Sequence, residues 1–487
     1  MRGPRPAIGL AAAVLAVVAV TLAAASVAPP TVGGSGGTQD VPIATAALVC
    51  PSPVEAADQT STVSALTPPD VLPDLGPDGG GSIARLGALE DPVPLAAAGT
   101  VTRWSPPGDG QATPVLAEAD GALAPGFAAQ QSTRAADGLS RGRSGTACAA
   151  SGTDFWFVGG GSDVGRVTTV YLTNVGEAPA LVNVDVFGPA GPVEAPGGRG
   201  IPVLPGQQER VAVDALAPGV ATLALHVTTS TGSVSAAVFD TAASGLEPLG
   251  NDWVPVSSAP STEVLVPGLA PAPDGSRQLV MLAPGAEPAL VRMQVIAPDG
   301  TFAPTGMDLV DVSPGEITTV DLSAVAPDVW ASLRLASDQP IVAGLRQVRG
   351  AAGQAPEFAY LAGGSALTGP TSVVDGTRDA STATVLLLVA PLGGVRGSLV
   401  VTPDGEAPVT TPFEVTAGTT SMLPLAPDAT SFTAVVVPER GSEPLYAARW
   451  VSELDARGPL VTAQPLRTPP ITVEQPAVDQ DLRTGLR

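Results

Sequence analysis

Few side chains in this sequence can carry chemistry, because its 487 residues include one histidine, two cysteines and no lysine. Residues 138–142 read Gly-Leu-Ser-Arg-Gly, which is the spacing of a hydrolase nucleophile elbow, and His226 follows in the order that hydrolases use. An elbow needs a buried strand before the serine and a helix after it, and the flanking residues predict neither. We therefore interpret Ser140 as part of a surface loop and predict that the protein is not an enzyme.

A glycine-rich stretch is the second candidate site. Gly159, Gly160 and Gly161 follow Trp156 and precede Asp163. The composition resembles a phosphate-binding loop, but the spacing matches neither the dinucleotide nor the Walker pattern, and a strand follows where a helix must begin. The favoured interpretation is a loop between two strands. The alternative is a binding loop made by these five residues, with Asp163 serving a carbonyl-rich or calcium site.

Other site chemistry lacks suitable residues. His226 lies in an alternating strand that points Leu225 and Val227 inward and the imidazole outward. One histidine and two cysteines that are expected to pair cannot build a transition-metal site, so we predict no metal and no cofactor. No spacing singles out a carboxylate pair for glycoside hydrolysis. The tryptophans are spread about one per domain, which is typical of structural core rings: Trp104, Trp156, Trp253, Trp330 and Trp450.

Composition narrows the class of protein further. The chain contains 56 glycines and 52 prolines, an excess that favours short strands and many turns over helices. Acidic residues outnumber basic residues 46 to 23, and no basic cluster stands out. Nucleic acid is therefore excluded as a partner, because binding it depends on Lys and Arg at the phosphates.

The N-terminus predicts export. An unbroken apolar run from Ala7 to Ala28 follows Arg2 and Arg5, and its length suffices to span a bilayer. The positive-inside rule then places the rest of the chain outside the membrane. Residues 1–28 are either a cleaved signal peptide or a membrane anchor, so the expected location is the extracytoplasmic side of the cell membrane or the medium.

The two cysteines are expected to form one disulfide. Cys50 and Cys148 both lie beyond the apolar run, and a pair of cysteines in an exported chain most simply bond to each other. The alternative is a pair of free buried thiols.

One pattern recurs along the chain. Gly206, Gly315 and Gly418 mark equivalent turns about one domain length apart, each set among six or seven short alternating strands. This pattern predicts an all-β protein of tandem immunoglobulin-like antiparallel β-sandwich domains after an N-terminal apolar helix. The predicted division is a linker at 29–45, a small β domain at 46–153, sandwiches at 154–256, 257–365 and 366–463, and a flexible tail at 464–487. Within each sandwich the last long strands are expected to form a hairpin, as at Ser337–Pro340.

The stretch from Phe155 to Gly161, Phe-Trp-Phe-Val-Gly-Gly-Gly, is followed by a Thr-Val-Tyr-Leu-Thr-Asn strand and by Pro-Gly, Val-Asp and Leu-Ala-Pro-Gly steps. From about Ala46 to Ala463 the chain resembles an actinobacterial exported family that is catalogued as domain of unknown function 5719. The resemblance implies an exported protein, tethered or secreted, and assigns no functional residues.

These observations favour an exported, membrane-anchored, non-enzymatic cell-envelope protein that serves as a scaffold or interaction module. The expected partners are the membrane, through the N-terminal helix, and envelope proteins or wall glycans. The alternatives are an accessory binder of cell-wall polysaccharide, which would use an exposed tryptophan or the glycine loop, and a hydrolase.

Overall fold

The computed structural model describes residues 38–52, 59–69, 71–72, 78–87, 92–106, 112–378, 381–425 and 429–476. The proposed signal peptide or anchor at 1–28 lies outside these residues. The described residues form antiparallel β-sheets, and among them no helix has the length and apolar character needed to cross a membrane.

The chain divides into two compact units, residues 1–42 with 472–487, and residues 43–471. The described part of the first unit is a two-stranded sheet, in which β1 (Thr38–Pro42) pairs with β36 (Thr472–Pro476). Both strands fall where the composition predicted a linker and a flexible tail, so those expectations need correction for these residues. The pairing joins strands that lie at opposite ends of the sequence, and the local composition of each segment cannot predict it.

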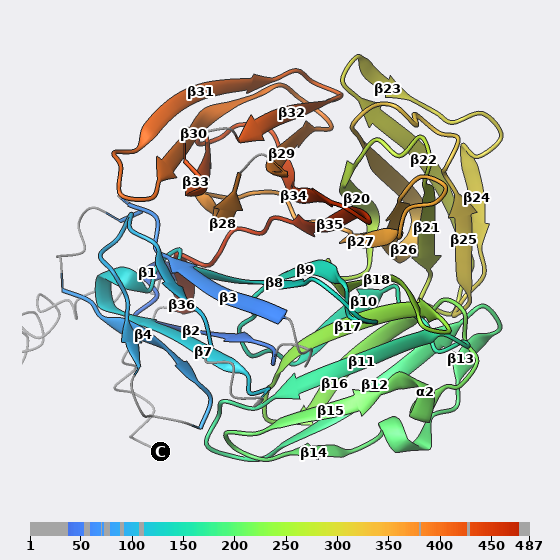
Figure 1. The fold of residues 1–487 in the computed structure, drawn as a ribbon, viewed down its shortest axis with the longest axis horizontal. Helices are drawn as coiled ribbons and strands as arrows, with labels where there is room; N and C mark the ends of the chain where they lie inside the picture. The colour runs from blue at the N-terminus through green and yellow to red at the C-terminus, as the bar shows by residue number, and fades with distance from the viewer. Residues whose placement is uncertain are drawn as a thin grey trace, which may run out of the picture. The chain divides into compact units, whose positions relative to one another are not determined.

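The second unit contains four consecutive sets of strands, which we call the first to fourth repeats and which follow the colour gradient of Figure 1. The first repeat comprises β2 (Thr45–Cys50), β3 (Gln59–Leu66), β4 (Gly81–Arg85), β5 (Val93–Pro94), β6 (Thr102–Trp104), β7 (Val115–Asp120), the 3-10 turn η1 (Gly121–Leu123), β8 (Ala128–Ala135) and β9 (Gly142–Ala147). The second comprises β10 (Asp154–Val158), β11 (Arg166–Thr173), β12 (Ala180–Gly188), β13 (Gly191–Val193), η2 (Pro196–Gly198), β14 (Ile201–Val203), β15 (Gln208–Ala212), α2 (Val213–Leu216), β16 (Ala224–Thr231), β17 (Ser235–Ser244), β18 (Glu247–Val254) and β19 (Val256–Ser257).

The third repeat comprises β20 (Ser261–Leu269), β21 (Ser276–Leu282), β22 (Ala289–Ala297), β23 (Gly300–Phe302), β24 (Leu309–Val312), β25 (Ile317–Asp321), β26 (Ala331–Arg349) and β27 (Glu357–Ala362). The fourth comprises β28 (Thr371–Thr377), β29 (Thr382–Ala390), β30 (Val395–Pro403), β31 (Val409–Val415), β32 (Thr419–Leu425), β33 (Ser431–Pro438), β34 (Tyr446–Asp455) and β35 (Gly458–Pro465).

All four repeats share one pairing pattern, with two sheets each. One sheet runs β5-β4-β7-β2 in the first repeat, β13-β12-β16-β10 in the second, β23-β22-β26-β20 in the third and β31-β30-β33-β28 in the fourth. The other runs β6-β3-β8-β9, β15-β11-β17-β18, β25-β21-β26-β27 and β32-β29-β34-β35. Apolar side chains of both sheets share one buried cluster in each repeat, which makes the repeats sandwich-like.

A glycine turn marks the same point in every repeat. Gly206, Gly315 and Gly418 have φ values of 69°, 72° and 70°, and their N–H groups donate to the carbonyls of Asn174, Ala283 and Ala390. Gly99, with φ 83°, donates in the same way to the carbonyl of Thr67. The three predicted marker positions are therefore structurally equivalent. Residues 46–153, expected to be a different and smaller domain, repeat the same strand pattern.

The expected hairpins are wrong. The strands on either side of each turn do not pair with each other: β16 and β17, and likewise β33 and β34, belong to different sheets. In the third repeat there is no turn at Ser337–Pro340, because β26 continues through it and passes from one sheet to the other. A turn sequence shows where a chain reverses, and it does not show whether the two arms join one sheet or two facing sheets.

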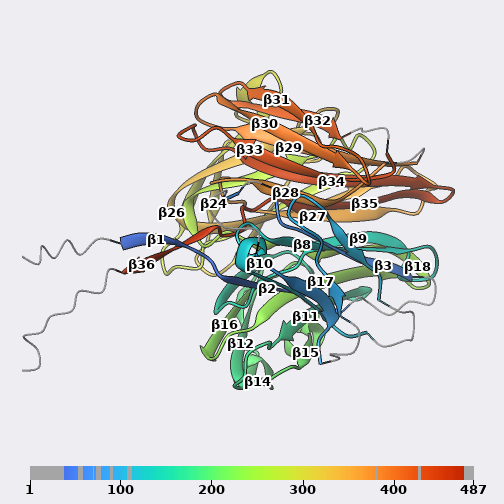
Figure 2. The same cartoon turned by 90° about the vertical axis from the view of Figure 1, so that its left-hand side faces the viewer.

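One strand near the end of each repeat lies against its counterparts in other repeats, and we call these four strands, β9, β18, β27 and β35, the closing strands. β9 contacts β18, β18 contacts β27, β27 contacts β35, and β35 contacts β9. The side view in Figure 2 places β9 and β18 near each other, with β27 and β35 close by. These four strands therefore hold the second unit together through contacts between repeats.

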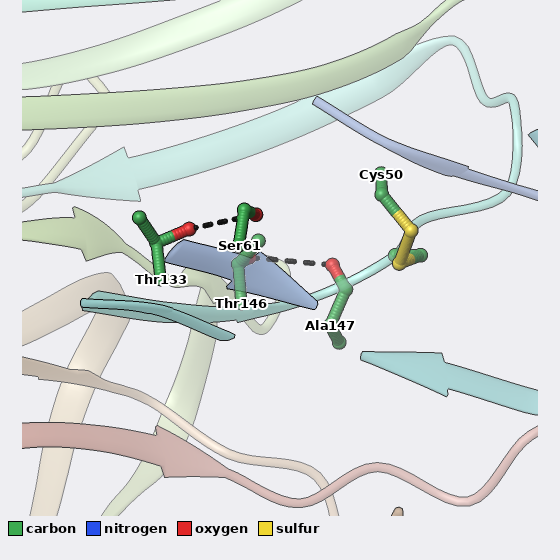
Figure 3. Close-up of a disulfide and its surroundings, with 6 residues drawn as sticks. Cys50, Ser61, Thr133, Thr146 and Ala147 are labelled. Carbon is green, nitrogen blue, oxygen red and sulfur yellow. Dashed lines mark hydrogen bonds between the residues drawn. A yellow bond between two sulfur atoms is a disulfide. The ribbon is translucent and has the colours of Figure 1, made fainter. Parts of the chain in front are cut away.

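The predicted disulfide is present in the first repeat (Figure 3). Cys50 ends β2 in one sheet and Cys148 follows β9 in the other, and their Cα atoms are 4.2 Å apart. Val49 and Ala149 exchange two backbone hydrogen bonds of 2.9 Å beside it. Both cysteines are buried, so the bond joins the two sheets inside the core.

Candidate functional site

The backbone N–H groups of the predicted glycine loop bond to its own repeat and to the next one. Its backbone N–H groups donate to groups of the protein: Gly159 to the carbonyl of Leu223 at 3.0 Å, Gly161 to the hydroxyl of Thr168 at 2.8 Å, and Ser162 to the carbonyl of Val220 at 2.7 Å. Gly160 donates to the phenol of Tyr360, a residue of β27 in the next repeat. These donors are occupied, so the loop does not present them to an anion.

The three glycines are needed for close packing. A Cβ on Gly159 would lie 2.7 Å from the Tyr360 ring, and one on Gly160 would lie 2.8 Å from the Thr168 hydroxyl. Gly161 approaches the Ala221 carbonyl in the same way, at 2.6 Å. Asp163 is exposed and caps its own turn, with the N–H of Val164 donating to its carboxylate at 2.7 Å. The loop therefore has a structural role that explains its glycines.

Beside the loop lies a cluster of polar side chains that connects the second and third repeats. The Tyr360 hydroxyl donates to the Asp240 carboxylate at 2.8 Å, and the Arg166 guanidinium binds the same carboxylate at 2.7 Å. Thr168 also bonds Asp240, at 2.7 Å. Burial, together with the charge of Asp240, raises the pKa of Tyr360 above its ordinary value. Tyr360 therefore remains neutral and joins β27 to the glycine loop.

Trp156 is 6% exposed and is not available as a platform for a ligand. Its ring stacks on His226, with ring centroids 3.9 Å apart, and belongs to an apolar cluster that includes Val280, Leu282 and Val342 of the third repeat. His226 is half-buried and contacts the Asp154 carboxylate at 3.1 Å. The alternation did predict that this face points away from the core of its repeat. It did not show that the next repeat covers the face.

The closing strands bring together polar side chains that sequence analysis missed. Asp252, on β18, is fully buried and accepts bonds from three other strands: from the N–H of Gly145 on β9, the N–H of Tyr360 on β27 and the hydroxyl of Thr462 on β35. Burial raises the pKa of Asp252 well above its ordinary value, although these hydrogen bonds act in the opposite direction. One carboxyl group thus contacts the last strand of every other repeat.

A second buried acid lies beside it. Glu357, at the start of β27, accepts bonds from the N–H groups of Asn251 at 2.8 Å and Phe358 at 3.2 Å. Its Oε2 has no hydrogen-bond partner among the described residues. Burial, together with the nearby Asp252, raises the pKa of Glu357 well above its ordinary value, and the charge of Arg141 opposes this rise.

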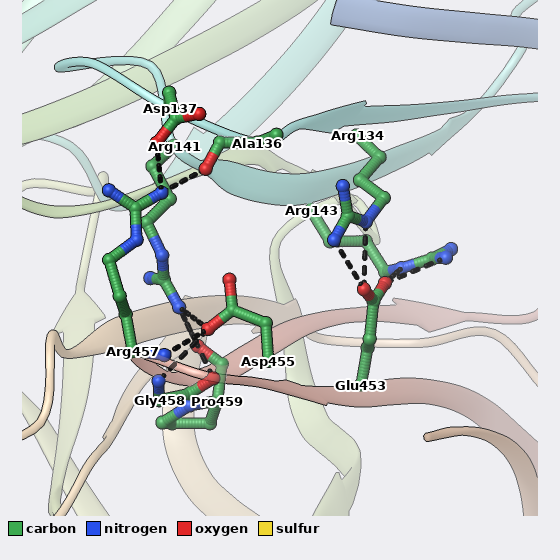
Figure 4. Close-up of polar contacts among 10 residues, drawn as sticks. All are labelled: Arg134, Ala136, Asp137, Arg141, Arg143, Glu453, Asp455, Arg457, Gly458 and Pro459. Atoms are coloured by element: carbon green, nitrogen blue, oxygen red, sulfur yellow. Dashed lines mark hydrogen bonds and ion pairs between the residues drawn. The ribbon is translucent and has the colours of Figure 1, made fainter. Parts of the chain in front are cut away.

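Ion pairs at one end of these strands connect the first and fourth repeats (Figure 4). Arg141, buried at 1% exposure, binds the Asp455 carboxylate at 2.8 Å and the Gly458 carbonyl at 3.2 Å. Arg134 and Arg143 bind the same carboxylate, that of Glu453, at 2.7 Å and 3.2 Å. These bonds hold the β8–β9 turn against the β34–β35 turn.

The structure does not bring the two residues of the predicted hydrolase pattern into one cavity. Ser140 lines a cavity of about 20 Å³, the size of one water, together with Asn251 and Trp253 but without His226. No group of three or more His, Cys, Asp or Glu side chains within the described ranges is placed to hold a metal ion. No sequence pattern marks Asp252, Glu357 or Tyr360, because their roles come from contacts between repeats.

The comparisons with known proteins agree with the expected resemblance. No curated protein matches this chain. One family, described as a family of unknown function, DUF5719, matches residues 104–426, from the first repeat into the fourth and more than half of the chain. The protein therefore belongs to the DUF5719 family of unknown function.

Proposed function

We propose that this protein is an exported, membrane-anchored or secreted cell-envelope protein that has no enzyme activity and serves as a scaffold or interaction module. The observation that carries the proposal is the joining of four repeats into one compact unit by their closing strands. The buried acids and arginines at this junction bond to groups of other repeats, which supports a structural role for them. Each repeat supplies an outer surface to the same body.

Export is supported by two features. The Cys50–Cys148 bond is of a kind that forms and persists in oxidising compartments outside the cytoplasm. The apolar run after Arg2 and Arg5 is a membrane-targeting pattern with the orientation that exports the remaining chain. We also assign each repeat an immunoglobulin-like architecture, on the strength of its two short-stranded antiparallel sheets around one core.

A cross-linking experiment in the producing cells tests this proposal. A photoreactive amino acid is placed at Leu246, which is 89% exposed, or at Leu454, which is 61% exposed, in the full-length chain. The proposal expects covalent capture of specific envelope proteins or wall glycans that are absent without irradiation. Capture of cytoplasmic proteins alone, or turnover of ester or glycoside substrates by the purified protein, would contradict it.

A further inference from the structure

A groove of about 480 Å³ lies between the third and fourth repeats. Its lining combines the indole of Trp330, the carboxylates of Asp328 and Glu414, and the hydroxyls of Thr416 and Ser421. No lysine, arginine or histidine is among the residues that line it. Grooves at the boundary between two domains are typical places for small ligands, which bind an aromatic side chain together with a few polar groups.

Trp330 is supported from the side of the core. Its ring meets that of Trp450 edge to face, with centroids 6.0 Å apart, and the Trp450 indole N–H donates to the Gly268 carbonyl at 2.6 Å. Trp450 is fully buried, whereas Trp330 is half-buried. Trp330 therefore has one part packed on the core of the third repeat and another part lining the groove.

The segment that carries Asp328 and Trp330 is held in a strained conformation. Ala326 has φ 47°, which makes it the only non-glycine residue with positive φ in the described part of the chain. The Arg277 guanidinium, 1% exposed, donates to the carbonyls of Val325 at 2.7 Å and Ala326 at 3.0 Å. Backbone strain of this kind persists only where the surroundings impose it, and it concentrates at ligand-binding sites.

The opposite wall is fixed to the third repeat. The Thr420 hydroxyl contacts the Ile296 carbonyl at 2.7 Å and the Ser332 hydroxyl at 3.1 Å, and the Thr301 hydroxyl donates to the Gly418 carbonyl at 2.9 Å. Both walls are thus set in place before a ligand arrives. A preformed groove loses little conformational entropy when it binds.

We propose that this groove binds a neutral saccharide strand, with one sugar ring stacked on Trp330 and its hydroxyl groups donating to Asp328 and Glu414. A sugar ring has an apolar C–H face for the indole and a rim of hydroxyls for carboxylates. Arg396 binds the Glu414 carboxylate at 3.2 Å but does not line the groove. The groove lining therefore carries two carboxylates and no basic side chain, which disfavours phosphorylated or uronic-acid ligands. This inference goes beyond the scaffold role and moves the expected glycan contact from the buried Trp156 to Trp330.

The test titrates cellohexaose, maltohexaose, chitohexaose and hexa-arginine into the purified full-length chain while following tryptophan fluorescence and calorimetric heat. We expect at least one neutral hexasaccharide to saturate the protein, and we expect Trp330→Ala and Asp328→Asn each to weaken its binding at least about tenfold. Trp330→Phe should retain more affinity than Trp330→Ala. Phe302→Ala removes an exposed aromatic ring that does not line the groove and should leave affinity unchanged.

Two results would overturn the proposal. One is the absence of binding by every hexasaccharide at up to about 10 mM, a concentration at which a dissociation constant of about 1 mM is measurable. The other is binding that Trp330→Ala and Asp328→Asn leave intact, with thermal midpoints showing that both variants are folded. Saturation by hexa-arginine alone is a case of the first result, and it would show that the groove takes a basic peptide in place of a saccharide.

Discussion

The Asp252 carboxylate on β18 accepts a 2.9 Å hydrogen bond from the Thr462 hydroxyl on β35, although 210 residues separate the two along the chain. The same carboxylate bonds Gly145 and Tyr360, so a side chain of the second repeat contacts the other three. The four repeats are therefore not independent domains joined only by the polypeptide chain. Substitution of Asp252 should therefore affect the stability of all four repeats.

Asp252→Ala should lower the free energy of unfolding by about 3 kcal/mol or more, because it leaves several buried donors without an acceptor. Thr462→Val removes one of these donors and should cost about 1 kcal/mol. Urea unfolding followed by tryptophan fluorescence measures both variants. Equal small effects of the two substitutions would show that Asp252 does not hold the repeats together.

Glu357→Gln should change how stability depends on pH. Burial raises the folded-state pKa of Glu357, so the folded protein keeps a proton that the unfolded chain releases above about pH 4.3. Stability should therefore fall as pH rises from the unfolded pKa toward the folded pKa, and Asp252 contributes in the same direction. Unfolding in urea from about pH 5 to about pH 8 should show a shallower decline in Glu357→Gln than in the wild type. Parallel pH profiles of Glu357→Gln and the wild type would show that Glu357 is not a source of this pH dependence.

Cys50→Ser should lower the free energy of unfolding by about 2–5 kcal/mol, since the bond closes a separation of 98 residues. The effect should be largest in the first repeat, where the bond joins the two sheets. Hydrogen exchange of the reduced and the oxidised protein, resolved along the chain, measures this. Exchange that quickens first outside residues 46–153 would be the contrary outcome.

Gly160→Ala should destabilise the protein by clearly more than Gly219→Ala. Both glycines have positive φ, at 93° and 76°, so both substitutions cost about 1 kcal/mol for the backbone conformation. Only at Gly160 does the new Cβ also meet the Thr168 hydroxyl, whereas Gly219 faces open space. Thermal unfolding compares the two variants directly. Equal losses of stability in the two variants would mean that Gly160 does not pack closely against Thr168.

Local signals in the sequence predicted the elements well. Turn glycines and alternating apolar residues located most strands of the last three repeats, and Gly206, Gly315 and Gly418 occupy one structural position. The equivalent Gly99 went unrecognised, because β5 and β6 beside it have two and three residues and carry little alternation. The first repeat is therefore recognised as a copy of the other three only through its pairing pattern.

The candidate site was less predictable for a physical reason. Sequence alternation does indicate which side chains point out of a sheet, as it did for His226, but the cover over that face comes from another repeat. Trp156, which belonged to the alternative binding loop, lies beneath this cover. The bonds of Asp252 and Glu357 also depend on how repeats meet, and no spacing within one repeat encodes that meeting.

Labelling of a single introduced thiol tests the proposed location most directly. Val164 is fully exposed, and the two native cysteines are bonded to each other, so Val164→Cys creates one reactive thiol on an otherwise thiol-free surface. Intact producing cells carrying Val164→Cys are treated with a membrane-impermeant maleimide, and cells with the wild-type chain serve as the control. If the chain lies outside the membrane, Val164→Cys is labelled on intact cells and the wild type is not. Labelling of Val164→Cys only after lysis, or of the wild type under denaturing conditions without reduction, would contradict the proposed location.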